Sequence, residues 1–295
     1  MNDEPSAASL VNGLVQLLNV EQTDENMFRG MRKPGGIGRV YGGQVVAQAL
    51  TSAIKTVDAS RSVHSLHAYF LRGGSEDHEI DYRVENDFDG GSFSNRRIIA
   101  SQQGEVIFNM AASFHISETG HHHQPPMPDV PAPEDLVTVQ EFIERYPEKA
   151  DKQLRPFYTR PGPMEMRCVT EPPFTLHESR DPHISFWFKT RAPLGQPQWM
   201  HRAVIAYASD LALIATAMRP HGPFRMQGAS LDHSVWFRQD MSADDWLLYS
   251  IDSPWAGQAR GLGIGHIFDR AGRLVATVAQ EGLMRDRDMR AAQGS

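Results

Sequence analysis

Asp210 is the residue of this sequence best suited to chemistry. It is the one charged residue between Ala203 and Met218, a run that is otherwise apolar or small. A helix with so few charges is largely buried, and burying a carboxylate without partners costs several kcal/mol. We therefore expect Asp210 to have hydrogen-bond partners, a raised pKa, or both. A carboxylate that caps neighbouring backbone or pairs with an arginine is the alternative.

Two further polar residues lie in predicted strands that follow this helix. Ser230 begins a predicted strand over residues 230–238, and Gln280 lies in the last predicted strand, in line with the apolar Ala276 and Val278. No Gly-x-Ser-x-Gly elbow surrounds Ser230, so it is expected to orient a water and not to act as a nucleophile. Hydrogen bonds to backbone or solvent are the alternative role for both residues. Asp210, Ser230 and Gln280 form the candidate catalytic set.

An internal repeat supports this choice. The stretch 64–72 resembles the stretch 228–238, with His67 matching His233 at a spacing of about 166 residues. Each copy reads as a long apolar helix followed by four strands, which predicts an α+β fold of two repeats, each a central helix wrapped by an antiparallel sheet. The first copy has His64 and Ala112 where the second has Ser230 and Gln280, and its helix has no acid. The chemistry is therefore expected in the second copy.

Hydrophobic periodicity and turn residues place the other elements. Helices are predicted over 7–18, 40–54, 134–146 and 201–218, and strands over 26–32, 64–72, 80–84, 92–101, 106–115, 164–169, 184–189, 230–238, 246–252, 258–268 and 273–285. Gly42 and Gly43 weaken the start of the second helix, which indicates that a strand or a substrate passes close to it. The predicted domains are 1–117, a Pro-rich linker over 118–160, and 161–295. His121–His123 lie in that linker, where a solvated tract is expected and not a metal site.

Composition excludes several classes of protein. A net charge of −7 argues against nucleic-acid binding. A single cysteine, Cys168, rules out a disulfide within the chain and indicates a reducing compartment. The N-terminus lacks a signal peptide and no apolar run is long enough to span a bilayer, so a cytoplasmic location is expected. No zinc spacing, Walker lysine or dinucleotide fingerprint is present, which predicts neither a metal nor a cofactor.

Five segments together resemble the acyl-CoA thioesterase II family. They are Gly38–Leu50, Tyr207–Asp210, Leu231–Phe237, Trp246–Ser250 and Gln280–Arg285. Their order along the chain makes the resemblance specific, and it covers nearly all of the sequence.

This resemblance implies a double hot-dog fold and the hydrolysis of fatty acyl-CoA to free acid and CoA, without a metal or a covalent intermediate. The family's catalytic aspartate and glutamine fall on Asp210 and Gln280, and Ser230 takes the place of its hydroxyl residue, which is threonine or serine. A role in lipid metabolism and a homo-oligomer, dimer or tetramer, are implied too.

Two other functions stay open at this point. One is a hot-dog hydratase or dehydratase acting on enoyl-CoA, although Asp181-Pro182-His183 lacks the asparagine of the hydratase signature and is interpreted as a turn. The other is a protein that binds acyl-CoA without turnover. Release of free thiol distinguishes hydrolysis from both.

Overall fold

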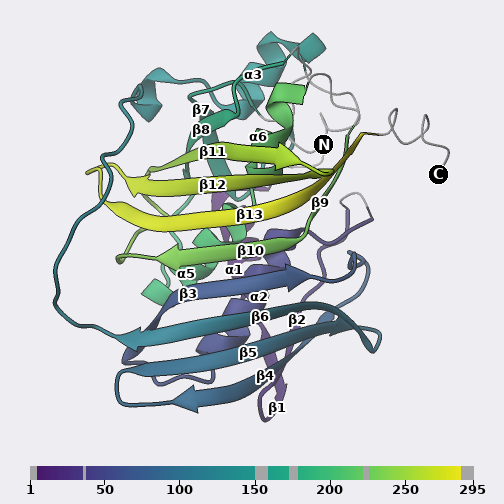
Figure 1. Cartoon of the computed structure of the whole chain (residues 1–295), viewed down its shortest axis with the longest axis vertical. Helices are drawn as coiled ribbons and strands as arrows, with labels where there is room; N and C mark the ends of the chain where they lie inside the picture. Colours follow the sequence, from purple (N-terminus) through teal and green to yellow (C-terminus); the bar gives the residue numbers. More distant parts are fainter. Residues whose placement is uncertain (1–4, 36–37, 150–158, 173–178, 222–225, 287–295) are drawn as a thin grey trace.

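A single antiparallel sheet with helices on one face forms the molecule (Figure 1). The computed structural model describes residues 5–35, 38–149, 159–172, 179–221 and 226–286. In these residues the sheet has 13 strands in the order β1-β2-β4-β5-β6-β3-β10-β13-β12-β11-β8-β7, and β9 pairs with β13. Strands of the two halves meet at β3 and β10, where Ser234 pairs with His67. The predicted α+β architecture of two repeats is confirmed.

The described elements have the following bounds. The strands of the first repeat are β1 (Glu21–Asp24), β2 (Met27–Gly30), β3 (Arg61–Phe70), β4 (Ile80–Asp89), β5 (Phe93–Gln102) and β6 (Glu105–Ile116). Those of the second are β7 (Met164–Cys168), β8 (His183–Thr190), β9 (Met226–Ser230), β10 (Asp232–Phe237), β11 (Leu247–Gly257), β12 (Arg260–Asp269) and β13 (Leu274–Asp286). The helices are α1 (Ala7–Leu18), α2 (Gly42–Ile54), α3 (Val139–Arg145), α5 (Gln198–Ser209) and α6 (Leu213–Met218), with 3-10 turns at Pro133–Asp135, Pro147–Lys149 and Arg219–His221.

Helix α2 is covered on every side, as its lack of charge predicted. Every residue from Gly43 to Ala53 is buried. Its polar side chains are satisfied inside the core: Gln48 donates to the carbonyl of Leu17 at 2.7 Å and accepts from the Tyr82 hydroxyl at 2.9 Å. Because α2 packs against both the sheet and α5, its two ends are held at fixed points of the fold.

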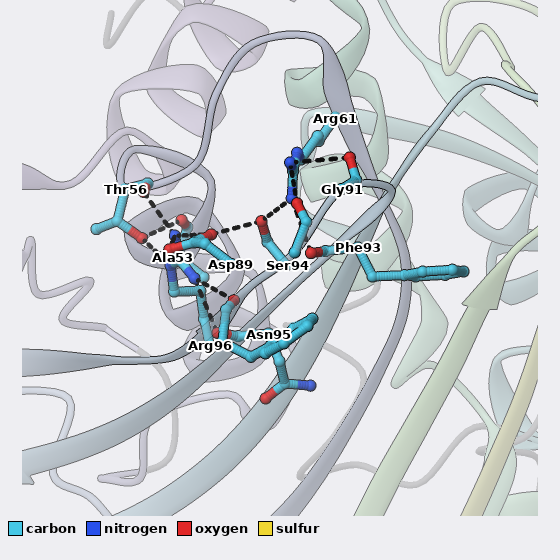
Figure 2. Close-up of polar contacts among 11 residues, drawn as sticks. Ala53, Thr56, Arg61, Asp89, Gly91, Phe93, Ser94, Asn95 and Arg96 are labelled. Carbon is cyan, nitrogen blue, oxygen red and sulfur yellow. Dashed lines mark hydrogen bonds and ion pairs between the residues drawn. The ribbon is translucent and has the colours of Figure 1, made fainter.

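Arg96 fixes the C-terminal end of α2 (Figure 2). Its side chain is 2% exposed and donates to the hydroxyl and carbonyl oxygens of Thr56, at 2.9 and 3.1 Å. The carbonyls of Phe88 and Asn95 accept from the same guanidinium, and its ion pair with Asp89 measures 2.9 Å. A cation beneath the last carbonyls of a helix also complements the helix dipole.

Arg96→Met is expected to lower the free energy of unfolding by about 2–4 kcal/mol, because several buried carbonyls lose their donor at once. Thermal or urea denaturation measures the loss. Arg97→Met is the matched control, since the neighbouring Arg97 pairs with Asp87 and both side chains are about half exposed. That pair is expected to contribute less than about 1 kcal/mol. Equal effects of the two substitutions would contradict the role given to Arg96.

Candidate active site

The helix that carries Asp210 is broken at that residue. A continuous helix over 201–218 was predicted, and this prediction is wrong: α5 ends at Ser209, Asp210 caps it, and Ala212 has a left-handed backbone with φ of 68° before α6 begins. Side-chain hydroxyls take the carbonyls freed by the break. Tyr249 donates to the carbonyl of Ser209 at 2.8 Å, and Tyr41 donates to that of Tyr207 at 2.9 Å. Inserted hydroxyls of this kind interrupt a helix without proline or glycine.

The acid of the second repeat is bound by the helix of the first. The backbone N–H of Gly43, in the first turn of α2, donates to Oδ2 of Asp210 at 2.9 Å. A Cβ atom at position 43 would lie 2.2 Å from the carbonyl oxygen of Tyr207, so only glycine permits this approach. The predicted close passage at the start of α2 is therefore confirmed, but α5 passes there and not a strand. The N-terminus of α2 favours the ionised carboxylate.

Gln280 reaches the same carboxylate from the sheet. It faces the helices from β13 with 1% exposure, as its alternation predicted, and its Nε2 donates to Oδ1 of Asp210 at 2.6 Å. Both carboxylate oxygens thus accept a hydrogen bond from a fixed donor. The three elements that supply these groups are α2, the α5–α6 break and β13.

Ser230 also contacts Asp210, although its strand differs from the prediction. The expected strand over 230–238 is interrupted at Leu231, so Ser230 ends β9, opposite Gly282, and β10 starts at Asp232. The interruption follows from shared pairing, because Leu231 donates to Glu281 of β13 while its carbonyl accepts from Phe70 of β3. The Ser230 hydroxyl lies close enough to Asp210 to lower the pKa of its carboxyl.

Burial raises the pKa of Asp210 from 3.8 to about 6, and hydrogen bonds from Gln280, Gly43 and Ser230 limit the rise. The residue keeps partial exposure, so a water or a substrate atom can reach it. A carboxylate with a pKa just below neutral is ionised at pH 7 and still basic enough to accept a proton from water.

A cavity of about 330 Å³ adjoins this carboxylate. Ser230 and Gly42 line it, and a Cβ at Gly42 would lie 2.7 Å from Oδ2 of Asp210. Its apolar wall comes from α2 and from the ends of β3 and β6. The cavity therefore offers space for a substrate next to the acid.

Other titratable groups close to the site have structural contacts. His233 is buried, its Nε2 lies 2.8 Å from the Ser209 hydroxyl, and burial lowers its pKa to about 3, so it stays neutral. Burial raises the pKa of the Cys168 thiol to about 12, which removes it as a nucleophile at neutral pH.

The described ranges of the chain hold neither a clustered set of metal ligands nor a long apolar helix. No group of three or more His, Cys, Asp or Glu residues there is arranged to hold a metal ion. His121–His123 are exposed in the segment between β6 and β7. No helix in the same residues has the length and apolar character needed to cross a membrane.

Sequence reasoning missed Tyr41, Tyr249 and the role of Gly43 as a hydrogen-bond donor to Asp210. The Gly42-Gly43 pair indicated a close approach but not its partner. For Tyr249, a signal was present in Gly265, because a Cβ there would lie 2.4 Å from the tyrosine ring. Such a glycine is recognisable only once the strand register is known.

Two helix-and-sheet repeats with one acid at their junction define a protein of the double hot-dog class. A hot-dog protein of unknown function from Alicyclobacillus acidocaldarius has the same fold, with a TM-score of 0.75 and 19% identity over 92% of this chain and 98% of that one. An acyl-CoA thioesterase II, TesB2, from Mycobacterium marinum has a TM-score of 0.77 and is 38% identical over 93% of this chain and 98% of its own.

Sequence comparison gives the family. Residues 32–115 match the acyl-CoA thioesterase N-terminal domain, and residues 133–284 match the acyl-CoA thioesterase C-terminal domain. Acyl-coenzyme A thioesterase 8 of Rattus norvegicus is 38% identical over 285 residues, which are 93% of this chain and 89% of that protein. The chain belongs to the acyl-CoA thioesterase family.

Proposed function

We propose that this protein hydrolyses acyl-CoA thioesters to free acid and CoA with a water molecule activated by Asp210. The observation that carries the proposal is the carboxylate itself: Gly43 and Gln280 each donate to one of its oxygens, at 2.9 and 2.6 Å, beside a cavity. Membership of the acyl-CoA thioesterase family supplies the substrate class.

In each catalytic cycle Asp210 takes up one proton and later releases it. Asp210 accepts a proton from water as the water oxygen attacks the thioester carbonyl. The tetrahedral intermediate then collapses, the carbon–sulfur bond breaks, and the CoA thiolate leaves. The proton held by Asp210 passes to the thiolate, which regenerates the carboxylate. No group is consumed, and no metal or cofactor takes part.

Ser230 and Gln280 supply positioning. Gln280 holds the carboxylate in one orientation, and the Ser230 hydroxyl, which lines the cavity, hydrogen-bonds the attacking water. Fixing the water against the thioester removes part of the entropic barrier. The first repeat has Gln44 at the position that matches Asp210, and it binds the carbonyl of Met31 instead. One repeat thus carries the chemistry and the other provides Gly43.

A single turnover in H₂¹⁸O tests the role of Asp210 as a base. With enzyme in excess over acyl-CoA, we expect one ¹⁸O atom in the product acid and equal rates of CoA and acid formation. Mass spectrometry of the acid and of the peptide that contains Asp210 makes the measurement. Label in Asp210, or a burst of CoA ahead of the acid, would instead identify the carboxylate as a nucleophile.

Hydration of enoyl-CoA and binding without turnover are the competing functions. A thiol-trapping dye separates them from hydrolysis, because neither releases CoA. A screen over saturated acyl-CoAs from short to long chains would also identify the chain-length preference. Absence of thiol release at every chain length would contradict the proposed function.

The proposed setting of this activity is lipid metabolism in the cytoplasm. The sheet leaves Tyr69 and Phe93 exposed, at 60% and 43%, and we expect a homo-oligomer, dimer or tetramer, to cover such aromatic surface. Light scattering on the purified protein tests this. The proposed division of the chain stays at 1–117, 118–160 and 161–295.

A further inference from the structure

The cavity beside Asp210 has polar, apolar and cationic lining residues. Ser230 and Gly42 line it, Gly42 lies next to the acid, and most of the other side chains that line it are apolar. Its remaining lining includes two guanidinium groups, Arg39 and Arg72. The apolar wall consists of Val40, Val45, Phe70, Leu71, Ile107 and Phe108. The cavity thus offers two cations to a ligand and lies next to the Asp210 carboxylate.

In the described part of the chain, neither Arg39 nor Arg72 has a close carboxylate partner that neutralises its charge. The Arg39 side chain is exposed and lies along the backbone at Gly73, and none of the described residues forms a hydrogen bond or ion pair with its guanidinium. Arg72 donates to the carbonyl of Val106 at 2.7 Å, which fixes its direction. Its ion pair with Glu105 is loose, at 3.8 Å between side chains that are 58% and 73% exposed. A pair so solvated leaves the guanidinium available to a second anion.

These cations are placed for one part of the proposed substrate. An acyl chain gains nothing from a guanidinium, whereas phosphate oxygens form short charge-assisted hydrogen bonds with it. The pantetheine arm of CoA carries methyl groups and amides and suits the apolar wall of the cavity. In a chain with a net charge of −7, two arginines at a substrate cavity also offset the repulsion of an anionic ligand.

We propose that Arg39 and Arg72 bind the phosphate groups of CoA while the pantetheine arm lies in the cavity and the thioester reaches Asp210 and Ser230. This assignment rests on the proposed function and adds the residues that select a CoA thioester over a simpler one. Arg39 and Arg72 are specificity residues: they contact a part of the substrate that does not react.

The test compares two substrates with the same acyl group, acyl-CoA and acyl-pantetheine, which lacks every phosphate. For Arg39→Gln and Arg72→Gln we expect KM for acyl-CoA to rise about tenfold each, and about a hundredfold in the double variant, with kcat within about twofold. KM for acyl-pantetheine is expected to stay unchanged. The double variant should therefore lose most of the wild-type preference for the CoA substrate.

Arg97→Gln, in β5, is the matched control and should leave both substrates unaffected. Calorimetry with free CoA gives a second readout without turnover: affinity should fall in the double variant, and added KCl should weaken CoA binding more in the wild type than in the double variant. Equal rises of KM for both substrates, or no change for either, would overturn the assignment. Hydrolysis of neither substrate by the wild type would instead overturn the proposed function.

Discussion

Asp210→Asn is expected to lower kcat for acyl-CoA hydrolysis by about a thousandfold, as removal of a general base does in other enzymes. Asparagine keeps the size of the side chain, and its amide can still accept from Gly43 and donate to the oxygen of a turned Gln280 amide. The loss therefore reports the missing base and not a collapsed site. Thiol release under saturating acyl-CoA measures it.

The same substitution is expected to stabilise the fold at neutral pH. The pKa of Asp210 is about 6 in the folded protein against an ordinary value of 3.8. Folding therefore favours the protonated form, and stability falls as the pH rises from about 4 to about 6. The difference between these two pKa values lowers the free energy of unfolding by about 3 kcal/mol above pH 6. Allowing for weaker hydrogen bonds, Asp210→Asn should gain about 1–3 kcal/mol at pH 7 and nothing at pH 4.

Asp87→Asn, in the exposed pair with Arg97, is the control for both effects and should change neither. An Asp210→Asn variant that retains more than about a tenth of the wild-type kcat would contradict the proposed mechanism. A variant that is inactive and also less stable at pH 7 would show that the carboxylate supports the fold instead.

Gly43→Ala is expected to have the second largest effect. The added Cβ would lie 2.2 Å from the Tyr207 carbonyl oxygen and 2.6 Å from the Tyr41 ring. Since the nearer atom belongs to the backbone of α5, the two helices must separate, and the Gly43 N–H then moves away from Asp210. We expect kcat to fall at least a hundredfold and stability to fall by about 1–3 kcal/mol, as overpacking of a core does.

Gly13→Ala provides the control for Gly43→Ala. Gly13 lies within α1, and a Cβ there meets nothing within 4 Å. This change should add about 0.5–1 kcal/mol of stability through helix propensity and leave the rate unchanged. Wild-type kinetics in Gly43→Ala would contradict the account of the α2–α5 junction.

The parts of the fold that follow local pattern could be predicted from the sequence. Helix α1 has the predicted bounds, because its leucines recur at helical spacing and Ser6 caps its first turn. Helix α2 was recognised from its lack of charge, and Asp210 from its isolation in an apolar run. These signals are local in the chain, so one sequence is enough to read them.

The parts that depend on contacts between residues distant in the sequence could not be predicted. The run around Asp210 contains no proline or glycine, and the hydroxyls that break its helix come from Tyr41 and Tyr249, far away in the sequence. The interruption at Leu231 likewise depends on pairing with β3 and β13 at once. The local sequence pattern predicts neither the helix break at Asp210 nor the strand interruption at Leu231. Both determine where the Asp210 and Ser230 side chains point.

The pH dependence of kcat/KM tests the central claim most directly, because it reports the ionisation of the base in the free enzyme. Acyl-pantetheine is the substrate to use, since CoA phosphates titrate in the same range. If Asp210 must be ionised, kcat/KM is constant above about pH 7 and falls tenfold per pH unit below about pH 6, in line with the raised pKa of this carboxylate. A profile that stays flat from pH 8 to pH 4.5, with the fold intact, would contradict the assignment of Asp210 as the base.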